Sequence, residues 1–277
     1  MAPPTFTLAS RIELANCLSM PQIHFVVYLT SGHETSQVVR WTSEVTIDSA
    51  QMVHNERESG RPSLTFSSEA NTAALKREDI QNLLFTSKLA SNSAYDAARR
   101  SVEQSANTCS LGYIGLFLLH SPYGGKHAKL KSCRAVEDAI DDGEIRVGGV
   151  KHLIASKPRI IPAVNQIEVH LFNIRTDITT LCQEHGIVVK TYAPLIRALG
   201  MKNATIISLS KKYHCTPGQL LVRRSLQNGN IPLPKSVKKE RIVENGNGVG
   251  FEIAEANMKT MDGWIGRVSD WDPTDCP

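Results

Sequence analysis

The sequence predicts an α/β protein built as a (β/α)8 barrel, and three observations favour this fold class. Short apolar runs, too short for independent helices, alternate with amphipathic segments along the chain. Several of these runs stop abruptly in polar residues, as at His120, Glu168 and Lys235, which is typical of parallel strands whose carboxyl ends open onto a site. The chain has 277 residues and is 41% hydrophobic, enough for one large domain and short for two.

Charge and hydropathy exclude several classes of protein. The net charge is only +4, and Lys and Arg are scattered among Asp and Glu, so a nucleic-acid partner is not expected. No apolar run approaches the roughly 20 residues that a membrane span needs. The first residues lack the basic and apolar parts of a signal peptide. We therefore expect a soluble, cytoplasmic protein that works as a monomer.

The six cysteines are widely spaced and form no Cys-x-x-Cys pair. In a chain without a secretion signal, this pattern is typical of reduced thiols packed on helices. The histidines likewise show no spacing that suits a metal ion. We expect neither a disulfide nor a metal site.

The first half of the chain supplies four expected strands and a short entry hairpin over residues 1–20. The strands are expected at Ile23–Tyr28, Thr46–Asp48, Asn82–Ser87 and Tyr113–Leu119. Helices are expected around Val38–Trp41, at Ala94–Ser105 with Ser93 as its cap, and at Leu130–Asp142. Only four residues separate Trp41 from the second strand, so the first crossover is shortened.

The second half completes the set of eight strands. They are expected at Glu144–Val150, Ile161–Ile167, Ile187–Tyr192 and Ile231–Pro234. Helices are expected at Asp177–His185, Ala204–Tyr213, Gly218–Gln227 and Lys238–Asn245. The crossover after the fifth strand is also shortened, because Lys151–Ile154 gives barely one turn before Pro158. Residues 251–277 are expected to form a tail, with Trp264 and Trp271 docked on the barrel.

Three strand ends bring a carboxylate, an amine and an imidazole to one face of this barrel: Asp48, Lys88 and His120. Each of them alone is more often an incidental polar terminator than a catalytic group. Together, at the second, third and fourth strands, they predict a proton-handling cluster, since a buried Lys–Asp pair holds a donor in place and shifts the pKa of a neighbour.

Five runs of sequence resemble the aldo-keto reductases in order, spacing and identity, over most of the chain from Met20 to Asp262. They are Thr86-Ser87-Lys88-Leu89, Leu118-Leu119-His120-Ser121-Pro122, Val164-Asn165-Gln166-Ile167-Glu168, Pro232-Leu233-Pro234-Lys235-Ser236, and Glu240-Arg241-Ile242 with Glu244-Asn245. The runs Tyr28-Leu29-Thr30-Ser31-Gly32 and Tyr123-Gly124-Gly125-Lys126 resemble fungal members.

The resemblance implies an enzyme that uses NADP(H) to reduce a carbonyl of a small or secondary-metabolite substrate. It gives Asp48 and Lys88 the role of tuning a tyrosine acid, and His120 the role of orienting the substrate carbonyl. It places Gln166 on the nicotinamide carboxamide and Tyr192 against its ring, and it counts Asp48 among the cofactor-binding residues as well. It assigns the adenosine 2′-phosphate and adenine to a further set: Lys235, Ser236, Arg241 and Asn245.

The sequence departs from this family at the reaction centre. The family's tyrosine falls five residues after the aspartate, and here that position is Val53, which cannot donate a proton. Removing a general acid typically costs about 10²–10⁴-fold in rate. His120 is the expected substitute donor, with His54 a weaker one. A Ser-Asn pair that grips the carboxamide in the family is also missing after Val150.

Three readings of the function stay open on the sequence alone. The first is a reductase with full or residual activity. The second is a non-redox descendant, either a cofactor-binding or scaffold protein or a lyase or cyclase that uses Lys88 and His120 as acid and base. The third is a decayed or mis-spliced gene product that folds poorly.

Overall fold

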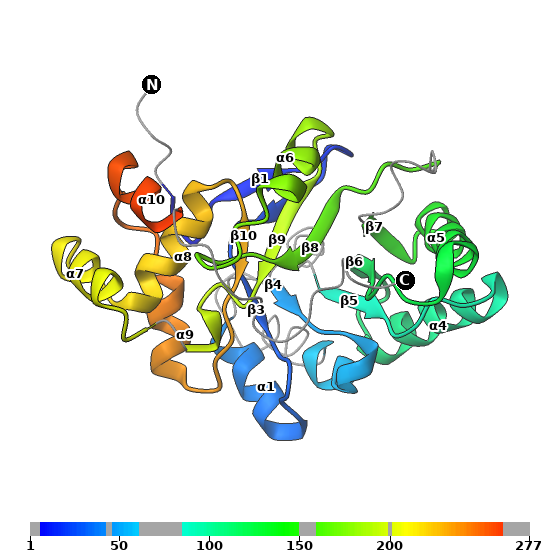
Figure 1. Ribbon diagram of the computed structural model, residues 1–277. Helices are drawn as coiled ribbons and strands as arrows, with labels where there is room; N and C mark the ends of the chain where they lie inside the picture. Colours follow the sequence, from blue (N-terminus) through cyan, green and yellow to red (C-terminus); the bar gives the residue numbers. More distant parts are fainter. Residues whose placement is uncertain (1–5, 43–45, 61–84, 150–158, 199–200, 263–277) are drawn as a thin grey trace. The chain divides into compact units, whose positions relative to one another are not determined.

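The structure is a computed structural model that describes residues 6–42, 46–60, 85–149, 159–198 and 201–262 (Figure 1). Contacts within the described chain divide it into two compact units. One unit holds residues 26–165, and the other holds residues 6–25 and 166–262. The expected domain limits, with a hairpin over residues 1–20 and a tail over residues 251–277, stay predictions.

A five-stranded sheet lies mostly in the 26–165 unit, with its strands in the order in which they occur along the chain. They are β3 (His24–Val26), β4 (Thr46–Asp48), β5 (Thr86–Leu89), β6 (Ile114–Leu119) and β7 (Ile145–Gly149). The pairs β4–β5, β5–β6 and β6–β7 are all parallel. The register sets Asp48 opposite Thr86 and Lys88 opposite Leu118, so the polar strand ends point the same way.

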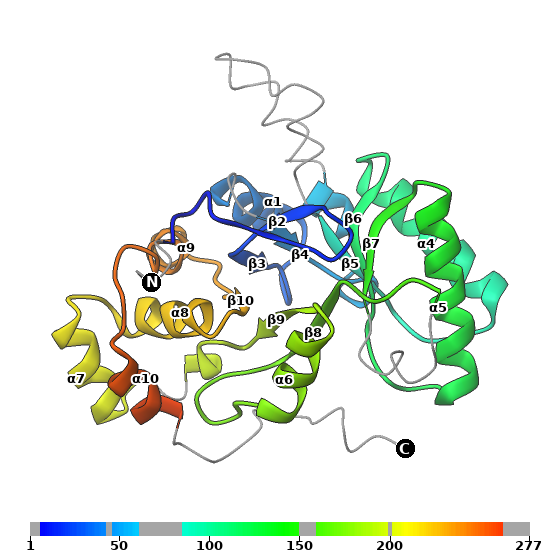
Figure 2. The same ribbon diagram turned by 90° about the horizontal axis from the view of Figure 1, so that it is seen from above.

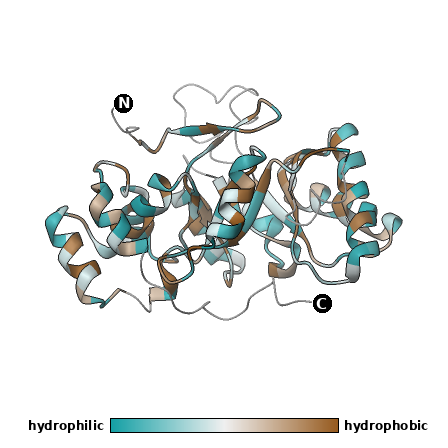
Figure 3. Ribbon diagram, turned by 45° about the horizontal axis from the view of Figure 1, so that its top comes forward, coloured by the Kyte–Doolittle hydropathy of each residue, from teal (hydrophilic) through white to brown (hydrophobic). Residues whose placement is uncertain are grey.

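Amphipathic helices connect these strands: α1 (Gly32–Trp41), α4 (Tyr95–Cys109) and α5 (Gly125–Asp141). Each buries one stripe of side chains, such as Ala98 and Val102 on α4, and exposes the other. Figure 3 shows this division as hydrophobic and hydrophilic colour on opposite sides of the helices. Helices α4 and α5 lie side by side in both ribbon views (Figure 2).

The second unit contains an antiparallel hairpin and most of a three-stranded sheet. The hairpin pairs β1 (Arg11–Glu13) with β2 (Ser19–Pro21). The sheet has the order β10-β9-β8, with β8 at Val164–Glu168, β9 at Val188–Tyr192 and β10 at Ile231–Leu233. Its helices are α6 (Thr176–Glu184), α7 (Ala204–Lys212), α8 (Pro217–Gln227), α9 (Lys239–Gly246) and α10 (Glu255–Asp262), with a short 3-10 turn, η3 (Ile196–Ala198).

The sequence fixes the starts of two of these helices through side-chain caps. Asn203 accepts hydrogen bonds from the backbone N–H groups of Thr205 and Ile206, which begins α7. Thr216 and Gln219 form a reciprocal capping box at the start of α8, and Pro217 occupies the first turn, where no N–H is required. These caps satisfy donors that a helix cannot satisfy internally.

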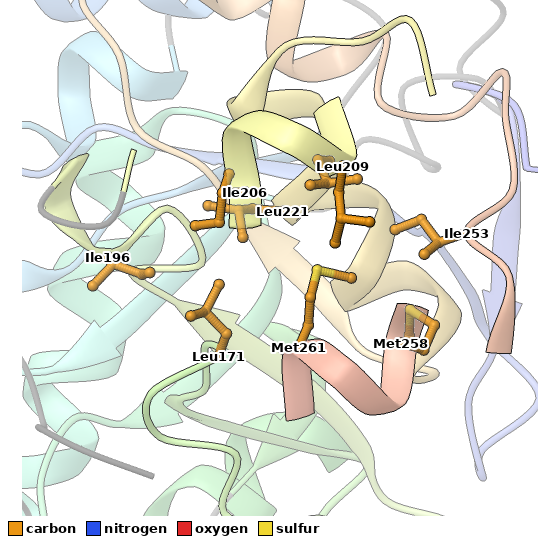
Figure 4. Packing of buried hydrophobic residues seen from close by; sticks show 9 residues of the cluster. Leu171, Ile196, Ile206, Leu209, Leu221, Ile253, Met258 and Met261 are labelled. Atoms are coloured by element: carbon orange, nitrogen blue, oxygen red, sulfur yellow. The ribbon is translucent and has the colours of Figure 1, made fainter. Parts of the chain in front are cut away.

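An apolar cluster joins the last helices of this unit (Figure 4). Side chains of Ile206 and Leu209 on α7 meet Leu221 on α8 and the two methionines of α10, Met258 and Met261. Arg224 of α8 also forms an ion pair with Asp262 at the end of α10. Helix α10 is therefore part of the core of its unit, a role that the sequence did not predict because the segment carries few periodic apolar residues.

The expected strands are confirmed, with ends that shift by a few residues. The cap of α4 was predicted wrongly: its N-cap is Ala94, in extended conformation, and the helix runs on to Cys109. The helices expected at Leu130–Asp142 and Asp177–His185 are confirmed as α5 and α6, in which Leu130 and Leu181 are exposed. The shortened crossover after Val150, the beginning of the third expected strand before Phe85, and Trp264 and Trp271 lie outside the described residues.

Candidate active site

A buried ion pair lies at the carboxyl ends of β4 and β5. Lys88 Nζ donates a hydrogen bond to Asp48 Oδ1 at 2.5 Å and another to the backbone carbonyl oxygen of Ser49 at 2.5 Å. Asp48 is 1% exposed and Lys88 is 7% exposed, so both charged groups are largely desolvated. Two charges are stable at such a depth only when each is paired and hydrogen-bonded.

Most of the hydrogen-bonding capacity of the Lys88 ammonium is therefore already used at the polar end of the sheet. An ammonium has three N–H donors, and two of them are taken by Asp48 and Ser49 within the described chain. The remaining donor can serve a bound molecule. The predicted contact between Asp48 and Lys88 is thus present, while the contribution of the Ser49 carbonyl could not have been read from side-chain types.

His120 lies beside this pair, one residue beyond β6. Its backbone N–H donates to the carbonyl oxygen of Leu89, the last residue of β5, at 3.3 Å. Desolvation and, second, the positive charge of Lys88 lower the pKa of the imidazole to about 4, while the Asp48 carboxylate opposes them. The residue is exposed on its open side, so solvent moderates the desolvation.

This lowered pKa changes the role expected of His120. A general acid at neutral pH should hold its proton near pH 7, and the sequence-based expectation rested on an imidazole with an ordinary pKa. An imidazole whose pKa is held near 4 is neutral at pH 7. It can donate an N–H hydrogen bond to a carbonyl oxygen, but it is a poor source of a proton.

Position 53 closes a short 3-10 turn, η1 (Gln51–Val53), that follows Asp48. The Val53 backbone N–H donates to the Ala50 carbonyl oxygen at 2.9 Å, and its side chain is half-buried. His54 adopts a left-handed conformation, with φ 57°, and is exposed. The described turn therefore places an aliphatic side chain where the family resemblance expects a phenol.

Asn55 anchors the far end of this turn and was missed by the sequence analysis. Its Nδ2 donates to the Val27 carbonyl oxygen at 2.9 Å, and its Oδ1 accepts from Ser49 Oγ at 2.6 Å. The side chain is 1% exposed. A polar residue seven positions after Asp48 gives no sequence signal for such a role, because both partners depend on the tertiary fold.

The second predicted group of residues lies in the other unit, around the start of α9. Ser236 Oγ accepts a hydrogen bond from the Lys238 backbone N–H at 3.1 Å, and the N-cap position of α9 has no side-chain cap. Lys235 and Arg241 are exposed on either side of this helix start. Uncapped N–H groups, a helix dipole and two cations are a combination that fits a phosphate group.

Asn245 lies in the last turn of α9 and is buried, with 4% exposure. It packs against Gly218 of α8, where a Cβ atom would come within 2.9 Å of Asn245 Oδ1. Only glycine leaves room for the amide at this contact. The adenine role predicted for Asn245 stays a prediction.

Gln166 and Tyr192 lie on neighbouring strands of the three-stranded sheet, β8 and β9. Gln166 is in the middle of β8 and Tyr192 is the last residue of β9, and both are half-buried. Their predicted contacts with a nicotinamide ring stay predictions. The structure thus brings Asp48, Lys88 and His120 together in one unit and places all the other predicted site residues in the other unit.

Two further properties of the described residues concern metal binding and membranes. Within them, no three His, Cys, Asp or Glu side chains are grouped so that they could hold a metal ion. No helix in the same part of the chain has the length and apolar character to cross a membrane.

Comparison with known proteins identifies the class. A model of the aldo/keto reductase family matches residues 45–265. An uncharacterized oxidoreductase of Schizosaccharomyces pombe is 38% identical, with 98% of this chain and 99% of the relative covered. A 9,11-endoperoxide prostaglandin H2 reductase of Trypanosoma cruzi is 31% identical, with 91% of this chain and 90% of the relative covered.

Solved structures agree with these relatives. A Bombyx mori aldo-keto reductase in complex with NADP is 25% identical and superimposes with a TM-score of 0.82, covering 98% of this chain and 99% of that one. The fold is therefore the (β/α)8 barrel of an oxidoreductase enzyme. The chain belongs to the aldo-keto reductase family.

Proposed function

We propose that the protein reduces the carbonyl group of a small-molecule substrate to an alcohol, using NADPH, at a rate limited by the loss of the phenol at position 53. The observation that carries this proposal is the buried Lys88–Asp48 pair with His120 beside it. Burying two charges has a high desolvation cost, so a pair kept at the open end of a sheet indicates a site rather than a structural contact.

The cofactor part of the proposal is supported by the residues around α9. Lys235 and Arg241 would bind the 2′-phosphate together with the free N–H groups of the helix start, and Ser236 and Asn245 would line the adenosine. Gln166 and Tyr192 would hold the nicotinamide. When bound, this cofactor supplies the hydride. A family member from Bombyx mori solved with NADP supports the same choice.

The protein's own residues then orient the carbonyl and stabilise its oxygen. The neutral His120 ring would donate an N–H hydrogen bond to that oxygen, and the remaining N–H of Lys88 would add positive charge nearby. Neither residue replaces a phenol as an acid: His120 is neutral at pH 7, and Lys88 is engaged with Asp48. A proton must then come from water, which makes turnover slow.

The proposals for substrate class, cellular location and oligomeric state rest on the sequence and its family resemblance. We propose a small aldehyde or ketone, or a secondary metabolite of fungal type, as substrate. We further propose that the protein works in the cytoplasm as a monomer.

A second candidate is a protein that binds NADPH without catalysing redox turnover, or a lyase or cyclase on the same barrel. Two observations favour it: the aliphatic side chain of Val53 in the described turn, and an imidazole whose pKa is held near 4. This candidate shares the cofactor site and differs only at the reaction centre.

A two-step experiment separates these proposals. Titration of the purified protein with NADPH, followed by nucleotide fluorescence, should saturate and should give tighter binding than NADH. Addition of a panel of aldehydes and ketones should then oxidise bound NADPH faster than in a Lys88→Ala control. Binding without turnover above that control supports the second candidate, and no binding of either nucleotide contradicts both.

A further inference from the structure

The turn between Asp48 and position 53 opens with Gln51, whose side-chain amide reaches two other elements. Its Oε1 accepts a hydrogen bond from the Ala90 backbone N–H at 2.8 Å and another from Ser101 Oγ at 3.0 Å. Its Nε2 donates to the Ser101 carbonyl oxygen at 2.9 Å and to Ser105 Oγ at 2.7 Å. One side chain therefore connects η1, the residue after β5, and helix α4.

This amide is fully used. A glutamine amide has one acceptor oxygen with two lone pairs and one nitrogen with two N–H groups. The four bonds of Gln51 occupy all of them, and Ser105 is buried, at 1% exposure. A half-buried amide with every position satisfied has one orientation, which makes it a rigid link.

The link lies just beyond the place where backbone pairing between β4 and β5 runs out. The register of the two strands pairs Asp48 with Thr86, and the Ser49 N–H donates to the Thr86 carbonyl oxygen at 2.9 Å. Ala90 follows two residues after Lys88, at a point where its N–H needs a new partner. Gln51 supplies that partner, so it holds the two strand ends together around the ion pair.

We propose that Gln51 is a positioning residue of the reaction centre: it fixes the approach of Lys88 to Asp48 and the direction in which η1 presents position 53. This inference rests on the proposed function for its effect on turnover. Its effect on the geometry of the Lys88–Asp48 pair is independent of that function. The stability of α4 alone does not require the Ala90 bond, since Ala90 precedes the helix.

The test replaces Gln51 by methionine, which has a similar length and no hydrogen-bonding amide. The matched control is Gln104→Met, because Gln104 is on α4 and exposed. With NADPH and a carbonyl substrate, Gln51→Met should lower kcat about tenfold or more while the KM for the carbonyl changes little, as expected when reacting groups are misplaced. The control should match the wild type.

A second readout needs no turnover. Labelled imidazole signals of the nine histidines, with His120 assigned through His120→Asn, report the pKa of His120 by NMR. If Gln51→Met loosens Lys88, that pKa should rise from about 4 toward the 6.5 of a free imidazole. A wild-type protein without turnover would contradict the proposed function and leave this readout to decide on Gln51.

Unchanged kcat and an unchanged His120 titration in folded Gln51→Met would contradict the inference. Should Gln51→Met fail to fold, two milder variants replace it. Ser105→Ala removes one of the four bonds, and Ser101→Ala combined with Ser105→Ala removes a second, in each case without adding a charge near His120. The double variant must then shift the His120 titration, and no shift in either variant overturns the inference.

Discussion

The two groups of site residues place their charges in opposite surroundings. At the ends of β4 and β5, Lys88 and Asp48 are buried and bonded to each other. At the start of α9, Lys235 and Arg241 are exposed to solvent. A buried pair is sensitive to any change of partner, because the remaining charge is left without water, while exposed cations lose only a modest and salt-dependent attraction. The first region is therefore sensitive to changes in side-chain geometry, and the second is sensitive mainly to changes in net charge.

The largest effect should come from restoring the phenol in the geometry-dependent region. Val53→Tyr is expected to raise the rate of carbonyl reduction about 10²–10⁴-fold, the typical contribution of a general acid. Steady-state kinetics with NADPH measure it, with Val53→Phe as the control that adds the ring without the hydroxyl. Equal rates in the two variants would show that the missing proton donor is not the defect.

Breaking the buried pair should destabilise the fold. Lys88→Met removes the ammonium that pairs with the buried Asp48 carboxylate and should lower the free energy of unfolding by about 3–5 kcal/mol. Urea denaturation measures this, and Lys131→Met, at an exposed position of α5, should change it by less than about 0.5 kcal/mol. A loss as small as that of the control would mean that Asp48 is reached by water.

Removing an exposed cation of the second region should affect affinity and leave stability alone. Arg241→Met is expected to raise the Kd for NADPH about tenfold, or about 1.4 kcal/mol, with almost no change for NADH, which lacks the 2′-phosphate. The difference should shrink as salt is added. Equal losses for both nucleotides would place Arg241 away from the 2′-phosphate.

The smallest effect is the pH dependence that His120 adds to stability. Its folded pKa, near 4, lies below the 6.5 of a free imidazole, so the unfolded chain binds the proton more readily. The contribution of His120 to the free energy of unfolding should be fully present above about pH 6.5 and should be lost toward pH 4. The loss should be about 1 kcal/mol after allowance for the exposed side of the ring. Urea midpoints across this range should fall less in His120→Asn. A midpoint series identical to the wild type would contradict the shift.

The sequence predicted the strands and the pairing of Asp48 with Lys88 because both depend on local patterns: apolar runs that end in a polar residue, spaced along one parallel sheet. It could not predict the bond of the Ser49 carbonyl oxygen to the Lys88 ammonium, or those of the Gln51 and Asn55 amides to the backbone of Ala90 and Val27, since these partners are far away in the sequence. The expectation of an ordinary pKa for His120 was wrong because burial of the ring and, second, the charge of Lys88 act on it only in the folded chain. Helix α10 was not predicted because its sequence shows no regular helical spacing of apolar residues.

Helix α10 has a consequence for how the chain may be shortened. Met258 and Met261 cover side chains of α7 and α8, and Asp262 neutralises Arg224. A version ending before Glu255 would expose apolar side chains of α7 and α8 and would leave the Arg224 guanidinium without Asp262. Such a product should aggregate and be degraded. A C-terminal truncation must therefore spare Asp262, and expression trials of versions that end before Glu255 should yield inclusion bodies.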